Sequence, residues 1–136
     1  MARTLVTGNH AAGEALSLAG EANRTARGCG GGAYPITPQT EIIEHLRAFE
    51  FSKGMIVPVE SEHSAMGVCI GVSLAGARSF TASSSNGLAY MTENVIVAGF
   101  YRLPISYLED FVANVERVSS PQMNPEVPSH AERIER

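Results

Sequence analysis

Polar side chains that could meet a ligand gather in three short turns of the sequence, at residues 34–37 (YPIT), 60–63 (ESEH) and 83–87 (SSSNG). The turns at 60–63 and 83–87 each follow a stretch that predicts an extended strand, and the turn at 34–37 falls in a short extended segment predicted at 33–36. Ligands of open parallel sheets bind beyond the carboxyl ends of the strands, so the three turns predict one binding edge. The alternative is that these side chains only cap helices. Thr37 followed by Pro38 has the pattern of a helix N-cap and first helical residue.

Glu62, in the second turn, is a candidate for acid–base chemistry. It falls between an apolar strand and an apolar helix, where a carboxylate could be partly buried. Burial penalises the charged form of a carboxylate, so such a group can share a proton with a ligand. The alternative is an ordinary first-turn glutamate that interacts with the helix dipole. Spacing alone leaves both interpretations open and does not choose between Glu62 and Glu60.

Metal and phosphate sites find little support in the pattern. The histidines and cysteines lack the spacing of metal ligands. The glycine-rich stretch 28–32 (GCGGG) lacks the Lys and Ser/Thr of a phosphate-binding loop. We therefore expect no metal site on this chain. These histidines and cysteines are His10, His45, His63, His130, Cys29 and Cys69.

A serine hydrolase is a further alternative. Ser83-x-Ser85-x-Gly87 resembles a nucleophile elbow, and Asp110 and His130 follow it in hydrolase order. The chain is short for a hydrolase sheet, and no oxyanion-loop motif precedes the serines. We therefore do not favour this function.

Alternating strand and helix patterns predict the elements that position the turns. Strands are predicted at 5–6, 55–59, 78–82 and from 103, helices at 10–22 (N-cap Asn9), from 38, at 64–77 and 88–101, and a loop at 23–32. This alternation predicts an α/β fold with an open, mostly parallel sheet and helices on both faces.

The composition narrows the class of protein. The chain has 136 residues and a net charge of −4, and its Lys and Arg residues are scattered, so we expect no nucleic-acid partner. No apolar run approaches the roughly 20 residues of a membrane-spanning helix, so we expect no membrane partner. The N-terminus lacks the pattern of a signal peptide. Two cysteines cannot supply a four-thiolate iron–sulfur site. We expect a cytoplasmic protein.

Three segments closely resemble the alpha subunits of pyruvate and related 2-oxoacid:ferredoxin oxidoreductases. They are 33–44 (AYPITPQTEIIE), 57–91 (VPVESEHSAMGVCIGVSLAGARSFTASSSNGLAYM) and 102–105 (RLPI), and 7–15 (TGNHAAGEA) is similar to the start of those subunits. The resemblance implies the thiamine-diphosphate-binding fold, with its pyrimidine-binding domain at 1–105 and a divergent polar segment at 106–136. Because the family's alpha subunits are far longer, we expect a truncated chain or a fragment.

The same resemblance implies roles for individual residues. Glu62 corresponds to the glutamate that hydrogen-bonds the pyrimidine ring nitrogen and favours the imino tautomer, which takes a proton from the thiazolium ring. Thr37 corresponds to a catalytic threonine that meets substrate and cofactor, and Tyr34 and Pro35 line the same turn. Arg117, in the stretch 114–121 (NVERVSSP), is the candidate for binding the substrate carboxylate.

The resemblance also implies cofactors and partners. Thiamine diphosphate would be shared with a partner subunit, and Mg²⁺ and iron–sulfur clusters would lie on beta, gamma and delta-type subunits only. A 2-oxoacid, coenzyme A and ferredoxin would react through the complex. Pyruvate is the first expectation for the substrate, with 2-oxoisovalerate, 2-oxoglutarate and oxalate open. An inactive interaction module with the same fold is the main alternative, and Asn86, where the family has glutamine, is one departure from the pattern.

Overall fold

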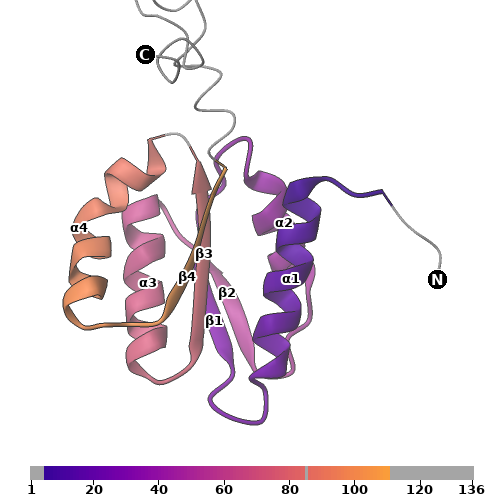
Figure 1. Ribbon diagram of the computed structural model, residues 1–136, viewed down its shortest axis with the longest axis horizontal. Coiled ribbons are helices and arrows are strands. Elements are labelled where there is room, and N and C mark those ends of the chain that lie inside the picture. The colour runs from indigo at the N-terminus through magenta and orange to yellow at the C-terminus, as the bar shows by residue number, and fades with distance from the viewer. Residues whose placement is uncertain (1–4, 85, 111–136) are drawn as a thin grey trace, which may run out of the picture.

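A four-stranded parallel sheet lies between two pairs of helices in residues 5–84 and 86–110, which the computed structural model describes, with side chains to residue 107 (Figure 1). The strands are β1 (Cys29–Ala33), β2 (Gly54–Pro58), β3 (Arg78–Ser84) and β4 (Ile105–Asp110). Helices α1 (Gly8–Ala22) and α2 (Thr40–Ala48) cover one face, and α3 (Glu62–Leu74) and α4 (Gly87–Phe100) cover the other. The predicted α/β fold with helices on both faces is confirmed.

The strand order β2-β1-β3-β4 determines where a ligand can bind. The chain passes from β1 through α2 to β2 on one side, and then crosses β1 through α3 to reach β3 on the other side. The order therefore reverses between β1 and β3. Crevices at such reversals, outside the carboxyl ends of the strands, are the usual ligand sites of this architecture.

The glycine-rich stretch forms the inner strand β1, so the prediction of a loop at 23–32 was wrong for its second half. A Cβ on Gly31 would overlap the carbonyl oxygen of Phe80, and a Cβ on Gly32 would overlap the backbone of Ala65 in α3. Glycine in a strand often marks such a close backbone approach. The glycines here allow β3 and α3 to pack directly against the strand.

The N-terminal predictions were also partly wrong. Residues 5–6 form no strand, and Leu5 is fully exposed because no strand lies beside it. Thr7, not Asn9, caps α1 by accepting a hydrogen bond from the backbone N–H of His10 at 3.2 Å. The Asn9 side chain donates instead to the carbonyl oxygen of Pro38.

Two further boundaries differ from their predictions. Thr37 does not cap a helix, because residues 37–39 form a turn after a cis Thr37–Pro38 bond and α2 begins at Thr40. The strand predicted as buried at 55–59 is the outer strand β2, and Met55 is 66% exposed because β2 pairs on one side only. Strand β4 crosses the domain boundary predicted after residue 105, and that boundary stays a prediction.

The core has one part on each face of the sheet. On the α1/α2 face, Ile42, Ile43 and Leu46 of α2 pack with Phe80 and Ala82 of β3. On the α3/α4 face, Met66 and Cys69 of α3 pack with Met91 of α4. Within the described part of the chain, no helix is long and apolar enough to cross a membrane.

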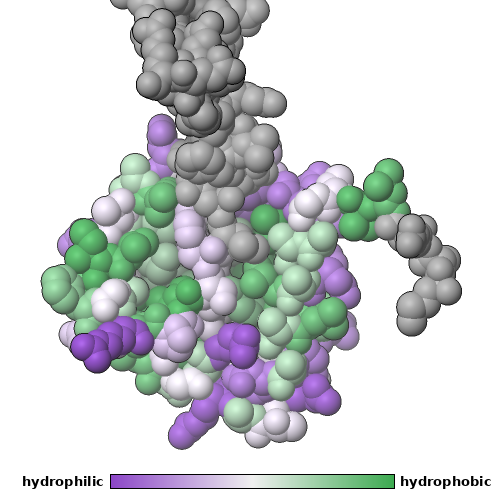
Figure 2. Space-filling view, viewed as in Figure 1, coloured by the Kyte–Doolittle hydropathy of each residue, from purple (hydrophilic) through white to green (hydrophobic). Residues whose placement is uncertain are grey.

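The outer surface of α4 and its surroundings carry large apolar side chains. Figure 2 shows hydrophobic surface over this side of the molecule. The exposed residues of this group are Leu74, Tyr90, Val95, Ile96, Phe100 and Tyr101.

Candidate functional site

The three polar turns that the sequence singled out lie at one edge of the sheet. They follow β1, β2 and β3, whose carboxyl ends point the same way because the strands are parallel. Helices α2, α3 and α4 begin at this edge (Figure 1). The predicted common edge is therefore present, and the turns after β1 and β3 flank the reversal in strand order.

Ser84, the last residue of β3, fastens the turn after β1. Its hydroxyl donates to the carbonyl oxygen of Thr37 at 2.8 Å, and the carbonyl of Ile36 lies 3.4 Å from the same oxygen. The Thr37 side chain stays exposed. This contact fixes the Thr37 backbone beside β3 and leaves its side chain free to meet a ligand.

Gln39 supports the same turn from within. It is fully buried, and its Nε2 donates to the carbonyl oxygen of Tyr34 at 3.1 Å. Its Oε1 is buried without a hydrogen-bond partner in the part of the chain that the structure describes. Sequence reasoning missed Gln39, because a polar residue near a helix start has the pattern of an ordinary surface residue. It placed Ser84 in the polar turn 83–87 but did not predict this contact.

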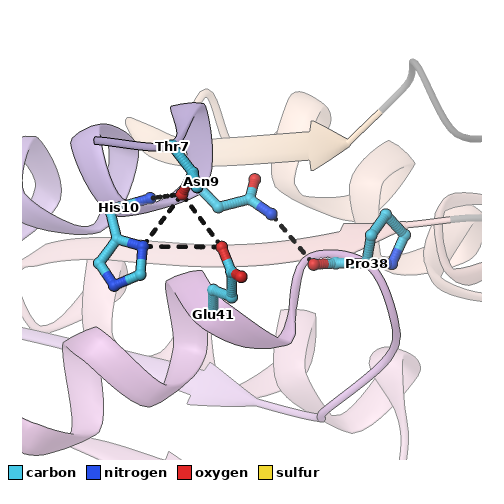
Figure 3. A network of polar contacts seen from close by, with 5 residues as sticks. All are labelled: Thr7, Asn9, His10, Pro38 and Glu41. Atoms are coloured by element: carbon cyan, nitrogen blue, oxygen red, sulfur yellow. Dashed lines mark hydrogen bonds and ion pairs between the residues drawn. The ribbon is translucent and has the colours of Figure 1, made fainter. Parts of the chain in front are cut away.

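Helix α1 fastens this turn from the other side (Figure 3). The Asn9 Nδ2 donates to the carbonyl oxygen of Pro38 at 3.0 Å, and the Thr7 hydroxyl donates to Glu41 Oε2 at 3.1 Å. His10 Nδ1 lies 3.7 Å from the same Glu41 oxygen. The segment that resembles the family's start thus holds the beginning of α2 against α1.

Glu62 is the first residue of α3 and is only 8% exposed, whereas Glu60 is exposed. Ser61 starts the helix, since its hydroxyl accepts a hydrogen bond from the backbone N–H of Ser64 at 3.1 Å. Both sequence interpretations of Glu62 therefore apply: it is a first-turn residue, and it is buried. The positive end of the α3 dipole favours a negative charge there.

The Glu62 carboxylate lies against Gly87, the first residue of α4. A Cβ on residue 87 would stand 3.1 Å from Glu62 Oε1 and would overlap the Ser83 hydroxyl. No hydrogen bond to the Glu62 carboxylate is found within residues 5–84 and 86–110. Glycine at 87 therefore leaves the space that these two side chains use, and the carboxylate keeps its hydrogen-bonding capacity for a ligand.

The structure brings most of the predicted site residues to one edge. Tyr34 is half-buried, Pro35 and Thr37 are exposed beside β3, and Glu62 lies under the start of α4. Arg117 lies outside the described residues, so its role stays a prediction.

The described residues give no support to a serine hydrolase or to a metal site. Ser85 and His130 of the hydrolase pattern lie outside the described residues, and the Ser83 side chain is fully buried. No group of three metal-ligating side chains occurs among the described residues.

Comparison with known protein families matches residues 31–126 to the family described as pyruvate flavodoxin/ferredoxin oxidoreductase, thiamine diphosphate-binding. The chain belongs to this family. The resemblance found in the sequence is thereby confirmed, and the matched residues include all three turns of the binding edge.

Similar proteins include two pyruvate synthase subunits and a ketoisovalerate oxidoreductase subunit. Pyruvate synthase subunit PorA of Thermotoga maritima is 54% identical over 77 residues, 54% of this chain and 19% of that protein. Ketoisovalerate oxidoreductase subunit VorA of Pyrococcus horikoshii is 50% identical over 93 residues, 65% of this chain and 22% of that protein. Pyruvate synthase subunit PorA of Methanocaldococcus jannaschii is 46% identical over 104 residues, 74% of this chain and 25% of that protein. The chain thus spans about a fifth to a quarter of the length of these relatives.

The residues at the edge fit the aminopyrimidine half of thiamine diphosphate. A buried carboxylate without a hydrogen bond among the described residues suits a ring nitrogen that carries a proton. The buried Gln39 Oε1 and Ser83 Oγ add polar atoms that lack partners among the described residues. The three turns contain no Lys or Arg, which suits the pyrimidine better than the diphosphate.

Proposed function

We propose that this chain supplies the pyrimidine-binding half of the cofactor site in a 2-oxoacid:ferredoxin oxidoreductase, as all or part of an alpha-type subunit. The observation that carries the proposal is the Glu62 carboxylate, buried at the reversal edge of the sheet and without a hydrogen bond among the described residues. The match to a thiamine-diphosphate-binding family supports the same ligand.

The side chains at this edge of the sheet would each have a separate role in binding and proton transfer. Thiamine diphosphate, when bound, supplies the electron sink for loss of CO₂ from a 2-oxoacid. Glu62 would hold a proton at the pyrimidine ring nitrogen, the general acid–base role for which its position suits it. Tyr34 and Pro35 would line the pyrimidine, and the exposed Thr37 hydroxyl would face both cofactor and substrate. Arg117 would bind the substrate carboxylate.

The rest of the reaction is assigned to partners. Beta, gamma and delta-type subunits would bring the diphosphate-binding half with its Mg²⁺ and the iron–sulfur clusters, and the complex would use coenzyme A and ferredoxin in the cytoplasm. Relatives named for pyruvate and for ketoisovalerate leave the substrate as a small 2-oxoacid, with pyruvate the first candidate.

A binding module without catalytic activity is the second candidate. The exposed apolar side chains of α4, such as Ile96 and Phe100, favour it, because apolar surface often marks an interface. Copurification with a beta-type subunit without turnover would support this candidate over the first.

Binding of the aminopyrimidine can be tested on the 136-residue chain alone. We expect thiamine and thiamine diphosphate to shift the backbone NMR signals of Tyr34, Glu62 and Gly87 with dissociation constants on the order of millimolar. Pyrophosphate is the control and should leave these signals unchanged. Equal shifts with pyrophosphate would contradict the proposal. So would the absence of any shift at the highest thiamine concentration that dissolves.

The acid–base role of Glu62 can be tested in a complex reconstituted with partner subunits. Glu62→Gln keeps the shape of the side chain and removes its acid–base function, so turnover should fall at least ~10²-fold. Glu60→Gln is the matched control, two residues away and exposed. If Glu60→Gln lowers turnover as much as Glu62→Gln, the assignment is wrong.

A further inference from the structure

Ser83 carries a buried hydroxyl that no described residue satisfies. It is the last but one residue of β3 and has no exposed surface, and its Oγ has no hydrogen-bond partner among the described residues. Burying a hydroxyl without a hydrogen-bond partner is energetically unfavourable. Such a group at a candidate site calls for an explanation, because most buried polar atoms are satisfied.

The Glu62 carboxylate lies next to this hydroxyl, with Gly87 between them. A Cβ on residue 87 would overlap Ser83 Oγ and would stand 2.9 Å from Glu62 Cγ and 3.1 Å from Glu62 Oε1. The two side chains therefore share the space that the missing glycine side chain leaves open. The hydroxyl has a proton to donate and the carboxylate has lone pairs to accept it. A hydrogen bond between them requires a rotation about the Glu62 side-chain bonds, because Ser83 Oγ has no partner among the described residues in the present arrangement.

We propose that Ser83 is a positioning residue, whose hydroxyl donates a hydrogen bond to the Glu62 carboxylate and holds it toward the aminopyrimidine. The inference rests on the proposed function of Glu62. Ser83 is buried behind Glu62 and acts through it. A hydrogen bond to a charged acceptor is stronger than one between neutral groups, so one hydroxyl suffices to fix the carboxylate. One carboxylate oxygen then accepts from Ser83 while the other faces the ligand.

The chain contains a matched control for this hydroxyl. Ser79 lies four residues earlier in β3, on the same face of the strand, and is also fully buried with an unpartnered Oγ. It pairs with Gly30 near the start of β1, at the opposite end of the sheet from Glu62. Ser79→Ala therefore removes an equivalent buried hydroxyl without altering the surroundings of Glu62.

The contact is tested without any ligand. Glutamate side chains are labelled with ¹³C at the carboxyl carbon, and Glu62 is assigned by the signal lost in Glu62→Gln. We expect Ser83→Ala to move the Glu62 carboxyl signal and Ser79→Ala to leave it in place. An unmoved Glu62 signal in Ser83→Ala, or an equal movement in Ser79→Ala, overturns the proposed hydrogen bond.

Thiamine binding tests the positioning role. Ser83→Ala should weaken thiamine binding about tenfold, the scale of one hydrogen bond to a charged group, and Ser79→Ala should bind like the unaltered chain. Unchanged thiamine affinity in Ser83→Ala overturns the positioning role while leaving the function of Glu62 intact. If the unaltered chain does not bind thiamine, the proposed function fails, and the carboxyl signal still decides whether Ser83 holds Glu62.

Discussion

The two faces of the sheet differ in how their helices bury apolar side chains. Helices α1 and α2 cover the larger buried cluster, whereas α3 and α4 cover a smaller one, and α4 also carries exposed apolar side chains. On the first face, Ile42, Ile43 and Leu46 are each at most 3% exposed and pack on Phe80 of β3. On the second, Ile96 and Phe100 of α4 are 54% and 83% exposed. Because burial of apolar surface stabilises the fold, we expect the α1/α2 face to contribute more to stability.

Removing a side chain from each face gives the largest expected difference. Leu46→Ala leaves a cavity in the closed core and should lower the free energy of unfolding by about 2–5 kcal/mol. Ile96→Ala removes an exposed side chain and should change it by less than about 0.5 kcal/mol. Urea denaturation followed by circular dichroism measures both. Similar losses in the two variants would show that the outer surface of α4 is packed.

Substitution of two glycines tests how closely the two sides of α3 are packed: Gly32 of β1 lies against the inner side, and Gly71 lies on α3 itself. Gly32→Ala forces a Cβ into the backbone of Ala65 and should destabilise the domain by about 1–3 kcal/mol or more. Gly71 lies in α3 with no atom near its Cβ position, so Gly71→Ala should stabilise the helix by up to about 1 kcal/mol. Thermal unfolding of both variants checks the sign. A stabilising Gly32→Ala would mean that β1 and α3 pack less closely.

Cys69 makes the α3/α4 face sensitive to alkali. Burial raises the pKa of the Cys69 thiol from 9.0 to about 11. Above pH 9 the unfolded chain loses this proton and the folded chain keeps it, so stability falls as pH rises toward 11, by up to about 1.4 kcal/mol per pH unit. Cys69→Ala should flatten this part of the pH profile of urea unfolding. An unchanged slope would contradict the assignment to Cys69.

The two asparagines that link helices on each face give the smallest expected effect. Asn9 donates to the Pro38 carbonyl, and Asn94 of α4 donates to the His63 carbonyl of α3 at 2.8 Å. Each change to Ala should cost about 1 kcal/mol. Amide hydrogen exchange separates them: Asn9→Ala should speed exchange around residues 39–42, and Asn94→Ala should not. Equal protection in both variants would mean that Asn9 does not hold this segment.

The sequence predicted much of the candidate site because the signals for its turns are local. Residues 57–91 and 33–44 place a strand, a polar turn and a helix in succession, so the three turns could be assigned to one edge before the structure was known. Glu62 was selected over Glu60 only through the family resemblance. The structure adds an independent reason, since Glu62 is buried at the start of α3 and Glu60 is exposed.

The sequence by itself determined the alternation of strands and helices, the polar turns and the family, because these follow from residue types that are neighbours in the chain. Only the tertiary structure decided that Gly31 and Gly32 form an inner strand, since the reason lies in the distant Phe80 and Ala65. It also decided that Ser83 lies beside Glu62. Contacts between residues far apart in the chain leave no periodic pattern, and burial is a property of the packed sheet rather than of either segment.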